Sequence, residues 1–139
     1  MSDNARWVRP LGSGADHRWE VVIDDRVDGW RHTGLYAGRL ADGESRAFDE
    51  GQREAIVVPL SGSVAVACVD AAGEKHEAEL AGRASVFAGP TDVAYLPAGS
   101  ETTITARGAA RVALAVAVTG GSGAPRPFRH VAADRKSVV

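Results

Sequence analysis

Alternation of apolar side chains with a period of two residues is the feature that most constrains the fold of this chain. In residues 111–118, valine and leucine occupy every second position and alanine occupies the positions between them. Successive side chains of a β-strand point to opposite faces of a sheet, so this pattern predicts a strand that is apolar on both faces. We therefore expect a second layer to pack closely against the alanine face.

Strand-like runs recur along the chain at intervals of roughly eight to twelve residues, which is typical of all-β proteins. The clearest of the other runs are 63–69, which alternates, and 54–60, which is almost continuously apolar. Weaker strands are predicted at 33–40, 44–49, 75–80, 84–87, 93–97 and 102–106. No stretch keeps the apolar i, i+3, i+4, i+7 spacing of an amphipathic helix. The sequence therefore predicts an all-β jelly roll or small barrel.

Glycine-containing pairs mark the predicted turns between these strands, because glycine tolerates the positive φ that tight hairpin turns require. The pairs are Asp42 with Gly43, Ser61 with Gly62, and Ala72 with Gly73. We expect an N-terminal arm over residues 1–17, a single barrel domain over 18–119, and a linker with a polar C-terminal tail over 120–139.

Length, charge and composition exclude several classes of protein. The 139 residues make one ordinary domain, and 16 basic against 18 acidic side chains give a net charge of −2. This balance excludes the broad basic surface that nucleic-acid binding usually requires. No apolar run approaches the ~20 residues of a membrane span. Residues 1–6 lack the apolar segment of a secretion signal, so we expect a cytoplasmic protein with neither nucleic acid nor membrane as a partner.

Two segments resemble the two conserved motifs of the cupin family. Residues 43–54 keep the opening glycine and the glutamate of the first motif, here Glu54. Residues 91–102 keep the aspartate of the second motif, here Asp92, and its Pro-x-Gly. The resemblance implies a cupin-like double-stranded β-helix, which is a jelly-roll barrel, as a single domain.

The histidines of these motifs are absent from both segments. Asp49 and Gly51 stand where the histidine pair would be, and Thr102 stands where the last histidine would be. Because Gly51 has no side-chain donor, a site of three histidines and a glutamate cannot form. We therefore expect the barrel to be metal-free.

The remaining histidines and the single cysteine do not restore a metal site. No two histidines have the spacing that places two imidazoles on one metal. We interpret them as surface residues or satisfied polar contacts; they are His17, His32, His76 and His130. Cys68 shares strand parity with Val64 and Val66, so we expect a small core residue rather than a reactive thiol.

Longer strings permit a narrower comparison. Residues 59–63 read Pro-Leu-Ser-Gly-Ser, and residues 82–92 read Gly-Arg-Ala-Ser-Val-Phe-Ala-Gly-Pro-Thr-Asp. With residues 28–35, these strings resemble the N-terminal half of the 5-deoxy-glucuronate isomerase family of bacterial myo-inositol catabolism. The resemblance runs from about residue 30 to residue 118.

The resemblance implies an aldose–ketose isomerisation that converts 5-deoxy-glucuronate to 2-deoxy-5-keto-gluconate. It also implies two cupin-like halves per protein, with the histidine-rich motif for a divalent metal in the second half. This chain corresponds to the first half, so we expect no cofactor in it and no turnover by it alone.

The expected ligand of the metal-free pocket is a uronic-acid-type sugar. The residues we propose to bind it, without assigning catalytic roles, are Arg46, Arg53, Glu54, Tyr95 and Thr102. Arginine suits bidentate recognition of a carboxylate. Strand parity places Arg46 and Phe48 on one face and residue 49 on the other, so not all of these groups can point inward.

Each arginine also has a structural interpretation. For Arg46 and Arg53 the sequence favours solvated charges that discourage pairing of edge strands. Arg83, within the most distinctive string, is interpreted as fixing a turn by donating to backbone carbonyl groups.

Two functions remain open from the sequence. The first is an enzyme subunit, in which this half forms the scaffold and an interface with a second cupin half. The second is a stand-alone cupin-fold module that binds a small molecule or assembles as a homo-oligomer without catalysis.

Overall fold

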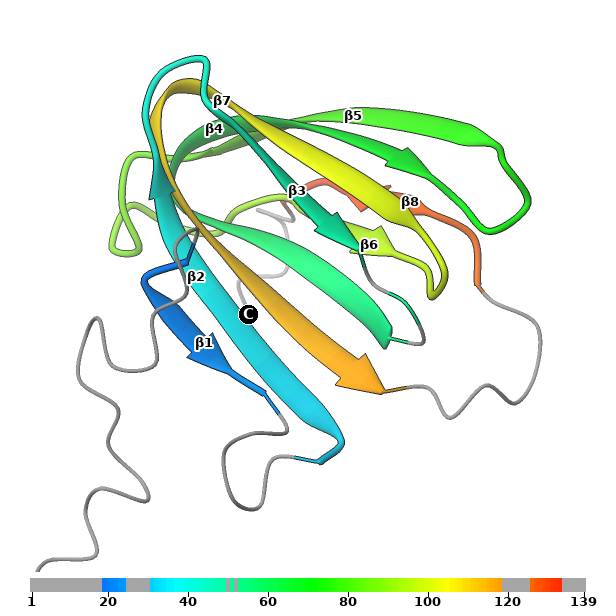
Figure 1. Cartoon of the computed structure of the whole chain (residues 1–139). Helices are drawn as coiled ribbons and strands as arrows, with labels where there is room; N and C mark the ends of the chain where they lie inside the picture. The colour runs from blue at the N-terminus through cyan, green and yellow to red at the C-terminus, as the bar shows by residue number, and fades with distance from the viewer. Residues whose placement is uncertain (1–18, 25–30, 50, 52, 119–125, 134–139) are drawn as a thin grey trace, which may run out of the picture.

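The computed structural model describes residues 19–24, 31–49, 51, 53–118 and 126–133, which form one antiparallel sheet of eight strands (Figure 1). The strands are β1 (Val21–Ile23), β2 (Thr33–Leu40), β3 (Ser45–Asp49), β4 (Arg53–Val69), β5 (Lys75–Arg83), β6 (Val93–Leu96), β7 (Glu101–Val118) and β8 (Arg129–Val131). The main path through the sheet is β1-β2-β7-β4-β6-β8, while β3 also pairs with β7 and β5 with β4. The described residues contain no helix, as the sequence predicts, and hence none that could cross a membrane.

The two longest strands, β4 and β7, bend near their middles, so that the two halves of the sheet face each other (Figure 1). The pairing of β4 with β7 shifts register between Pro59 and Ser63, and Gly62 has a φ of +79° there. A Cβ at Gly62 would lie 2.6 Å from the carbonyl oxygen of Ala109 on β7, so only glycine fits this close approach. The predicted hairpin turn at Ser61 and Gly62 is therefore wrong: these residues form a bulge inside β4, since the chain continues along the same partner strand.

The core fills the space between the two facing halves. Val112, Leu114 and Val116 of β7 are at most 4% exposed, which confirms the predicted face for these three residues, whereas Val118 at the end of the strand is 45% exposed. The expected small core residue Cys68 is 1% exposed, which confirms its assignment. On the opposite face of β7, however, Ala115 is exposed, so no layer of the described part of the chain covers the alanine face as we expected.

The loop after β5 differs from its prediction. Residues 84–87 were expected to form a strand but form bends and turns instead, and Phe87 is 94% exposed. Arg83 explains this path, because its Nε donates to the carbonyl oxygen of Pro59 (3.2 Å) and its Nη1 donates to that of Gly89 (2.9 Å). The interpretation of Arg83 as a residue that fixes a turn is thus confirmed.

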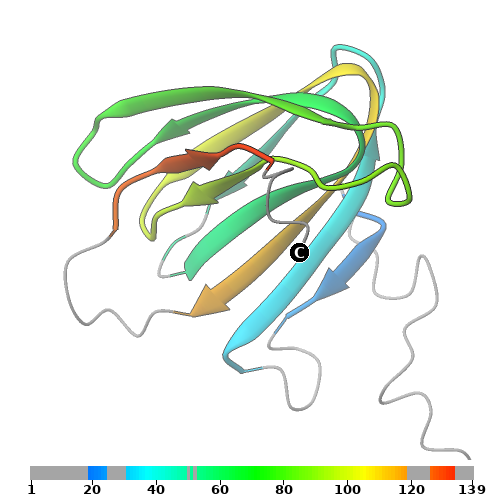
Figure 2. The same ribbon diagram turned by 180° about the vertical axis from the view of Figure 1, so that it is seen from behind.

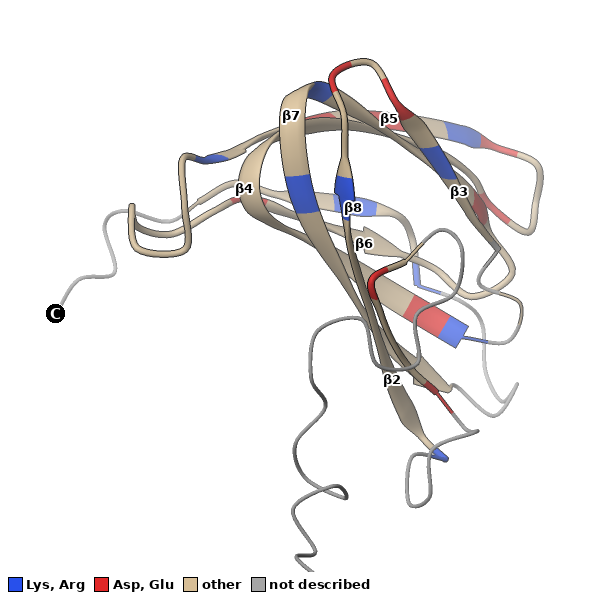
Figure 3. Ribbon diagram, turned by 60° about the vertical axis from the view of Figure 1, so that its left-hand side comes forward, with Lys and Arg blue, Asp and Glu red and all other residues tan. Residues whose placement is uncertain are grey.

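The C-terminal segment also differs from the expected polar tail. β8 pairs with β6 (Figure 2), and Phe128 packs against the core. The expected arm at 1–17 and the Gly-rich linker at 120–123 lie outside the described residues. Basic and acidic residues are scattered over the strands (Figure 3).

Candidate functional site

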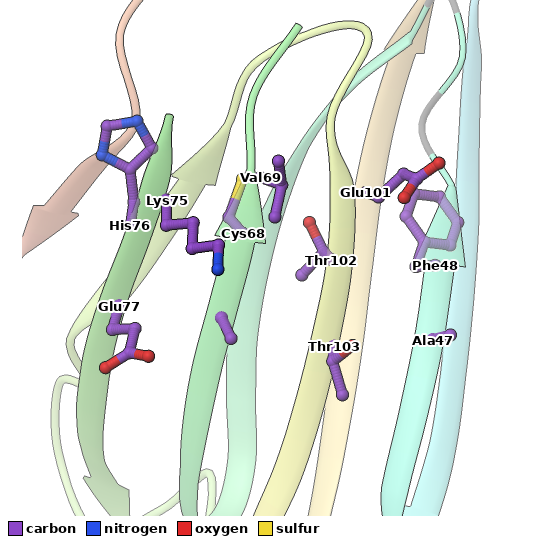
Figure 4. A pocket seen from close by; sticks show the side chains of 11 residues that line it. Ala47, Phe48, Cys68, Val69, Lys75, His76, Glu77, Glu101, Thr102 and Thr103 are labelled. Carbon is purple, nitrogen blue, oxygen red and sulfur yellow. The ribbon is translucent and has the colours of Figure 1, made fainter. Parts of the chain in front are cut away.

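Four hydrogen-bonded strands form one half of the bent sheet, in the order β5-β4-β7-β3. We call the end of the sheet away from the bend the open end (Figure 1). Strand register places one residue from each of β5, β4, β7 and β3 in a row across the sheet, namely His76, Cys68, Thr102 and Phe48. A pocket of about 350 Å³ crosses the same four strands, but most of its lining residues are exposed and have the opposite strand parity, among them Lys75, Glu77 and Thr103 (Figure 4). Thr102 is only 2% exposed, so its side chain lies on the inner face of the sheet.

Aromatic rings from both halves of the sheet meet beside this row. Tyr36 of β2 lies edge-on to Phe48 of β3, with ring centroids 5.2 Å apart, and is 6.1 Å from the ring of Trp19. Arg53, the first residue of β4, places its guanidinium carbon 5.8 Å from the Tyr36 ring centroid and 5.5 Å from that of Phe48. Its Nη1 also donates to the Tyr36 hydroxyl (2.9 Å). Arg53 is therefore held at the open end by ring contacts and a hydrogen bond.

Arg46 lies in the same aromatic cluster but further inside. It is 8% exposed and its guanidinium carbon is 5.2 Å from the centroid of the Trp19 ring. Its Nη2 donates to Glu44 Oε2 (2.8 Å) and to the carbonyl oxygen of Arg39 (3.2 Å). A backbone hydrogen bond from Ala41 and the pairing with Arg46 lower the pKa of Glu44.

These contacts correct one interpretation and confirm another. Arg46 is buried and Arg53 is half-buried against aromatic rings, so neither is the solvated edge charge that the sequence favoured. Arg46 and Phe48 do lie on the same, inner face of β3, as strand parity predicts.

Glu54 and Tyr95 lie on the other side of the sheet. Ala55 and Val57 of β4 are buried, so Glu54 points to the opposite, outer face. There its Oε2 accepts a hydrogen bond from the Tyr95 hydroxyl of β6 (2.5 Å). Burial and the hydrogen bond to Glu54 raise the pKa of Tyr95 to about 12. The glutamate of the motif therefore does not share the inner face with Thr102.

The donors of the inner row do not fit a centre of three histidines and a carboxylate. The row offers the Thr102 hydroxyl, the Cys68 thiol and one imidazole, that of His76. His76 Nε2 is hydrogen-bonded to Asp70 Oδ2 (2.8 Å), and its ring stacks on Phe128 with centroids 5.2 Å apart. The imidazole of His76 is thus already occupied by protein contacts.

Asp70, Glu74 and His76 bring one ligand atom each to within 4.8 Å of one another. Asp70 Oδ1 also accepts the backbone N–H groups of Ala72 and Glu74, so the carboxylate closes the turn between β4 and β5. The hydrogen bond from His76 is the main cause of the lowered pKa of Asp70. These contacts account for the cluster as part of the turn.

His130 makes a similar contact on β8, where its Nε2 lies 2.9 Å from Asp92 Oδ2. His76 and His130 are thus satisfied polar contacts and His32 is exposed, as we interpreted them, while His17 lies outside the described residues. Burial raises the pKa of Asp92, but hydrogen bonds from Gly82, His130 and Ala81 outweigh burial and lower the pKa overall.

The structure thus divides the five proposed binding residues. Arg53 and Thr102 lie on the inner face near the open end, Arg46 lies deeper on the same face, and the other two lie outside. Sequence reasoning missed Tyr36, whose role depends on a contact with Arg53 across seventeen positions of the chain. The aromatic character of Tyr36 within a predicted strand was the only local signal.

The KduI/IolB family model matches residues 7–138 of the chain. Among solved structures, an IolB-like protein from Salmonella typhimurium LT2 aligns with a TM-score of 0.71 and 25% identity, over 85% of this chain and 43% of that one. This chain therefore spans less than half the length of that protein. No curated protein matches it.

Two oxalate decarboxylases share the fold at lower identity. A variant of the Bacillus subtilis enzyme aligns with a TM-score of 0.59 and 20% identity, over 83% of this chain and 31% of that one. The Lactobacillus farciminis enzyme aligns with a TM-score of 0.56 and 16% identity, over 73% and 28%. With the antiparallel sheet, these matches confirm the predicted all-β, cupin-like fold.

Proposed function

The chain belongs to the KduI/IolB family, and from this premise we propose that it is the N-terminal, metal-free cupin half of a 5-deoxy-glucuronate isomerase-like protein. The observation that carries the proposal is the extent of the two matches: the family model spans residues 7–138, whereas the IolB-like structure is matched over 43% of its length. A match of that size fits one of two cupin halves. In this role the chain acts in the cytoplasm on a uronic-acid-type sugar.

The chemistry explains why this half would depend on another. Aldose–ketose isomerisation removes a proton next to a carbonyl and returns one to the neighbouring carbon. A general base contributes roughly 10²–10⁴-fold to such a step. A metal that polarises the carbonyl contributes several kcal/mol more, and about 1.4 kcal/mol is worth a factor of ten. The inner row around Thr102 supplies neither a carboxylate nor a free imidazole, so we assign it to binding and scaffolding and place the divalent metal in the second half.

The contacts suggest separate tasks for the residues of this half. Arg53 and Thr102 face the open end and are the residues we assign to sugar binding. Arg46 stabilises the barrel beneath Trp19 through its contacts with Glu44. Glu54 and Tyr95 lie on the outer face, where a neighbouring domain would meet them.

A turnover assay tests the proposal. The chain is incubated with 5-deoxy-glucuronate and Mn²⁺, and the appearance of 2-deoxy-5-keto-gluconate is followed by proton NMR. We expect no product above the uncatalysed rate, and product once a metal-loaded C-terminal half from an IolB-type protein is added. Turnover by the chain alone at the rate of a two-half enzyme would refute the assignment.

A stand-alone assembly module is the second candidate, and the outer face of the sheet favours it. Strand register places Leu35, Ala115 and Ile56 side by side on that face, and Ile56 is 40% exposed. A row of apolar side chains that the described residues leave partly exposed is typical of an interaction surface. In the module this face would meet a second copy of the chain, whereas in the enzyme half it would meet the second cupin half.

Sedimentation and sequencing separate the two candidates. The enzyme half is supported if the chain is a monomer that binds the added C-terminal half and if the Ile56→Glu variant no longer binds it. A stable homo-oligomer that Ile56→Glu dissociates, with no affinity for the added half, supports the module. A histidine-rich cupin segment in the DNA that follows this reading frame would favour the enzyme half independently.

A further inference from the structure

Two arginines line one cavity at the end of the sheet where β2, β7 and β4 lie side by side. The cavity has a volume of about 380 Å³, which is within the range of small-molecule pockets. Arg31 precedes β2 and Arg53 begins β4, while Val116 and Val118 of the intervening strand β7 form an apolar wall. The cavity therefore combines two cationic groups with a surface for C–H groups.

Arg53 enters the cavity in a fixed orientation. Its guanidinium is in contact with the rings of Tyr36 and Phe48, and its Nη1 donates to the Tyr36 hydroxyl. The planar guanidinium loses less conformational freedom per hydrogen bond than a flexible ammonium group does. A rigid guanidinium at the cavity wall is suited to a planar acceptor such as a carboxylate.

Arg31 differs from Arg53 in its contacts. Its side chain is exposed, and it makes no hydrogen bond or ion pair with any residue in the described part of the chain. Among the described residues, one carboxylate, that of Asp24, lines the cavity beside the two arginines. Two guanidinium groups against one carboxylate in the described lining favour an anionic ligand over a neutral one of the same shape.

Two residues with hydroxyl groups also line the cavity. Tyr36 and Thr33 both line the cavity, and each hydroxyl can donate or accept a hydrogen bond. Such groups are matched by the hydroxyls of a polyol, whose C–H groups would lie against the valines of β7. The arrangement thus has a place for each part of a hydroxylated acid.

We propose that this cavity is a binding subsite for a small hydroxy acid, whose carboxylate lies between Arg31 and Arg53 and whose hydroxyls face Tyr36 and Thr33. The subsite lies within this half and contains residues that the five sequence candidates do not include. It rests on the proposed function only in the choice of sugar acids as the first probes.

The test compares an acid with its neutral counterpart on the full chain. D-glucuronate and D-glucose share one ring and differ in the oxidation state of one carbon, so their affinities isolate the carboxylate. We expect glucuronate to bind at least about tenfold more tightly than glucose in calorimetric or NMR titrations. Arg31→Gln should weaken glucuronate binding about tenfold or more and leave glucose binding unchanged, because one charge-assisted contact is lost.

A matched charge-loss variant controls for net charge. Arg107 of β7 is exposed, pairs with Glu79 and does not line the cavity, so Arg107→Gln should leave glucuronate affinity within about twofold. Arg53→Lys keeps the charge but loses the planar group, and should also weaken glucuronate binding. Melting curves establish that each variant is folded, and the exposed Arg31 provides a site where substitution does not touch the core.

The inference is overturned if wild-type protein does not prefer glucuronate to glucose, or if Arg31→Gln binds glucuronate as Arg107→Gln does. Inorganic phosphate that competes as well as glucuronate would also overturn it, since the ligand would then be any anion. The turnover assay with the added C-terminal half is independent of these titrations. Turnover by the wild-type pair, together with unchanged glucuronate binding by Arg31→Gln, would reject the subsite and keep the proposed function, whereas glucuronate binding that depends on Arg31, without turnover, would do the reverse.

Discussion

Replacing Asp92 with asparagine exchanges a carboxylate for a carboxamide. We expect it to destabilise the protein more than any other exchange of this kind in the described part of the chain. The carboxylate of Asp92 is 8% exposed and connects three segments. Its Oδ2 accepts the backbone N–H of Ala81 and its Oδ1 accepts that of Gly82, both at 2.9 Å. Oδ2 also bonds to His130 of β8. Asp92 thus fixes the end of β5 and the position of β8 relative to the start of β6.

The magnitude follows from these bonds. A hydrogen bond to a charged group contributes about 1.5–3 kcal/mol, and a buried donor left without an acceptor costs about 1–3 kcal/mol. Asparagine keeps one acceptor oxygen, but its amide nitrogen would face the second backbone N–H. Both groups are donors, so that backbone N–H would lose its acceptor. We therefore expect Asp92→Asn to lower the free energy of unfolding by about 2–4 kcal/mol. For a chain of this size that corresponds to a fall in Tm of roughly 10 °C.

Urea denaturation followed by circular dichroism measures the loss, and Asp42→Asn is the matched control. Asp42 Oδ1 accepts the backbone N–H of Gly108 (2.8 Å), but that bond is exposed to solvent. Water can replace the lost acceptor there, so we expect less than about 1 kcal/mol. Equal losses for the two variants would show that the buried carboxylate of Asp92 does not hold these segments together.

The same carboxylate predicts a dependence on pH. Because the folded pKa of Asp92 is lowered, its stabilisation is present above the unfolded pKa of about 3.9 and is lost as the pH falls through the folded value. The difference in unfolding free energy between wild type and Asp92→Asn should therefore be full at pH 5 and narrower at pH 3. A difference that widens on acidification would contradict the assigned direction of the pKa.

Three further substitutions test other contacts. Gly82→Ala should lower the free energy of unfolding by about 3 kcal/mol or more in urea titrations, since a Cβ would overlap the main chain at a φ of +68°. Gly43→Ala is the control: Gly43 has a φ of +78° but open space around it, so the loss should be only about 1–2 kcal/mol. Tyr95→Phe should remove the ultraviolet titration step near pH 12 and cost about 1 kcal/mol through the lost bond to Glu54. Arg83→Lys should lose the forked contact with two carbonyl oxygens, and limited proteolysis should then cleave the loop after β5 faster than in wild type.

The strands with regular alternation were predicted well because their periodicity is local. The predicted strand at 33–40 coincides with β2, and the buried face of 111–118 is the one that the alternation indicates. The prediction fails at 84–87, where an apolar run looks like a strand but the chain turns. Arg83 holds that turn through Pro59, a residue 24 positions earlier, and a local pattern contains no trace of such a contact.

The candidate site was predicted only in part, for a related reason. Parity placed Arg46 and Phe48 together correctly, since their neighbours in β3 differ in polarity. It could not orient Glu54, because the run 54–60 is apolar on both faces and either face looked buried. The contact between Arg53 and Tyr36 depends on the order of β2, β7 and β4 in the sheet, which alternation does not encode.

The two cupin-like segments are joined through the main chain rather than through metal ligands. The backbone N–H of Gly99, in the second segment, donates to the carbonyl oxygen of Gly51 in the first (2.6 Å). Both glycines have positive φ, so their backbone conformation is one that glycine adopts without strain. This contact between the two segments does not involve the side chain at position 102. Substituting histidine for Thr102 would add one imidazole, but Gly51 would still lack a donor and Glu54 would still point outward, so one substitution cannot convert this pocket into a metal centre.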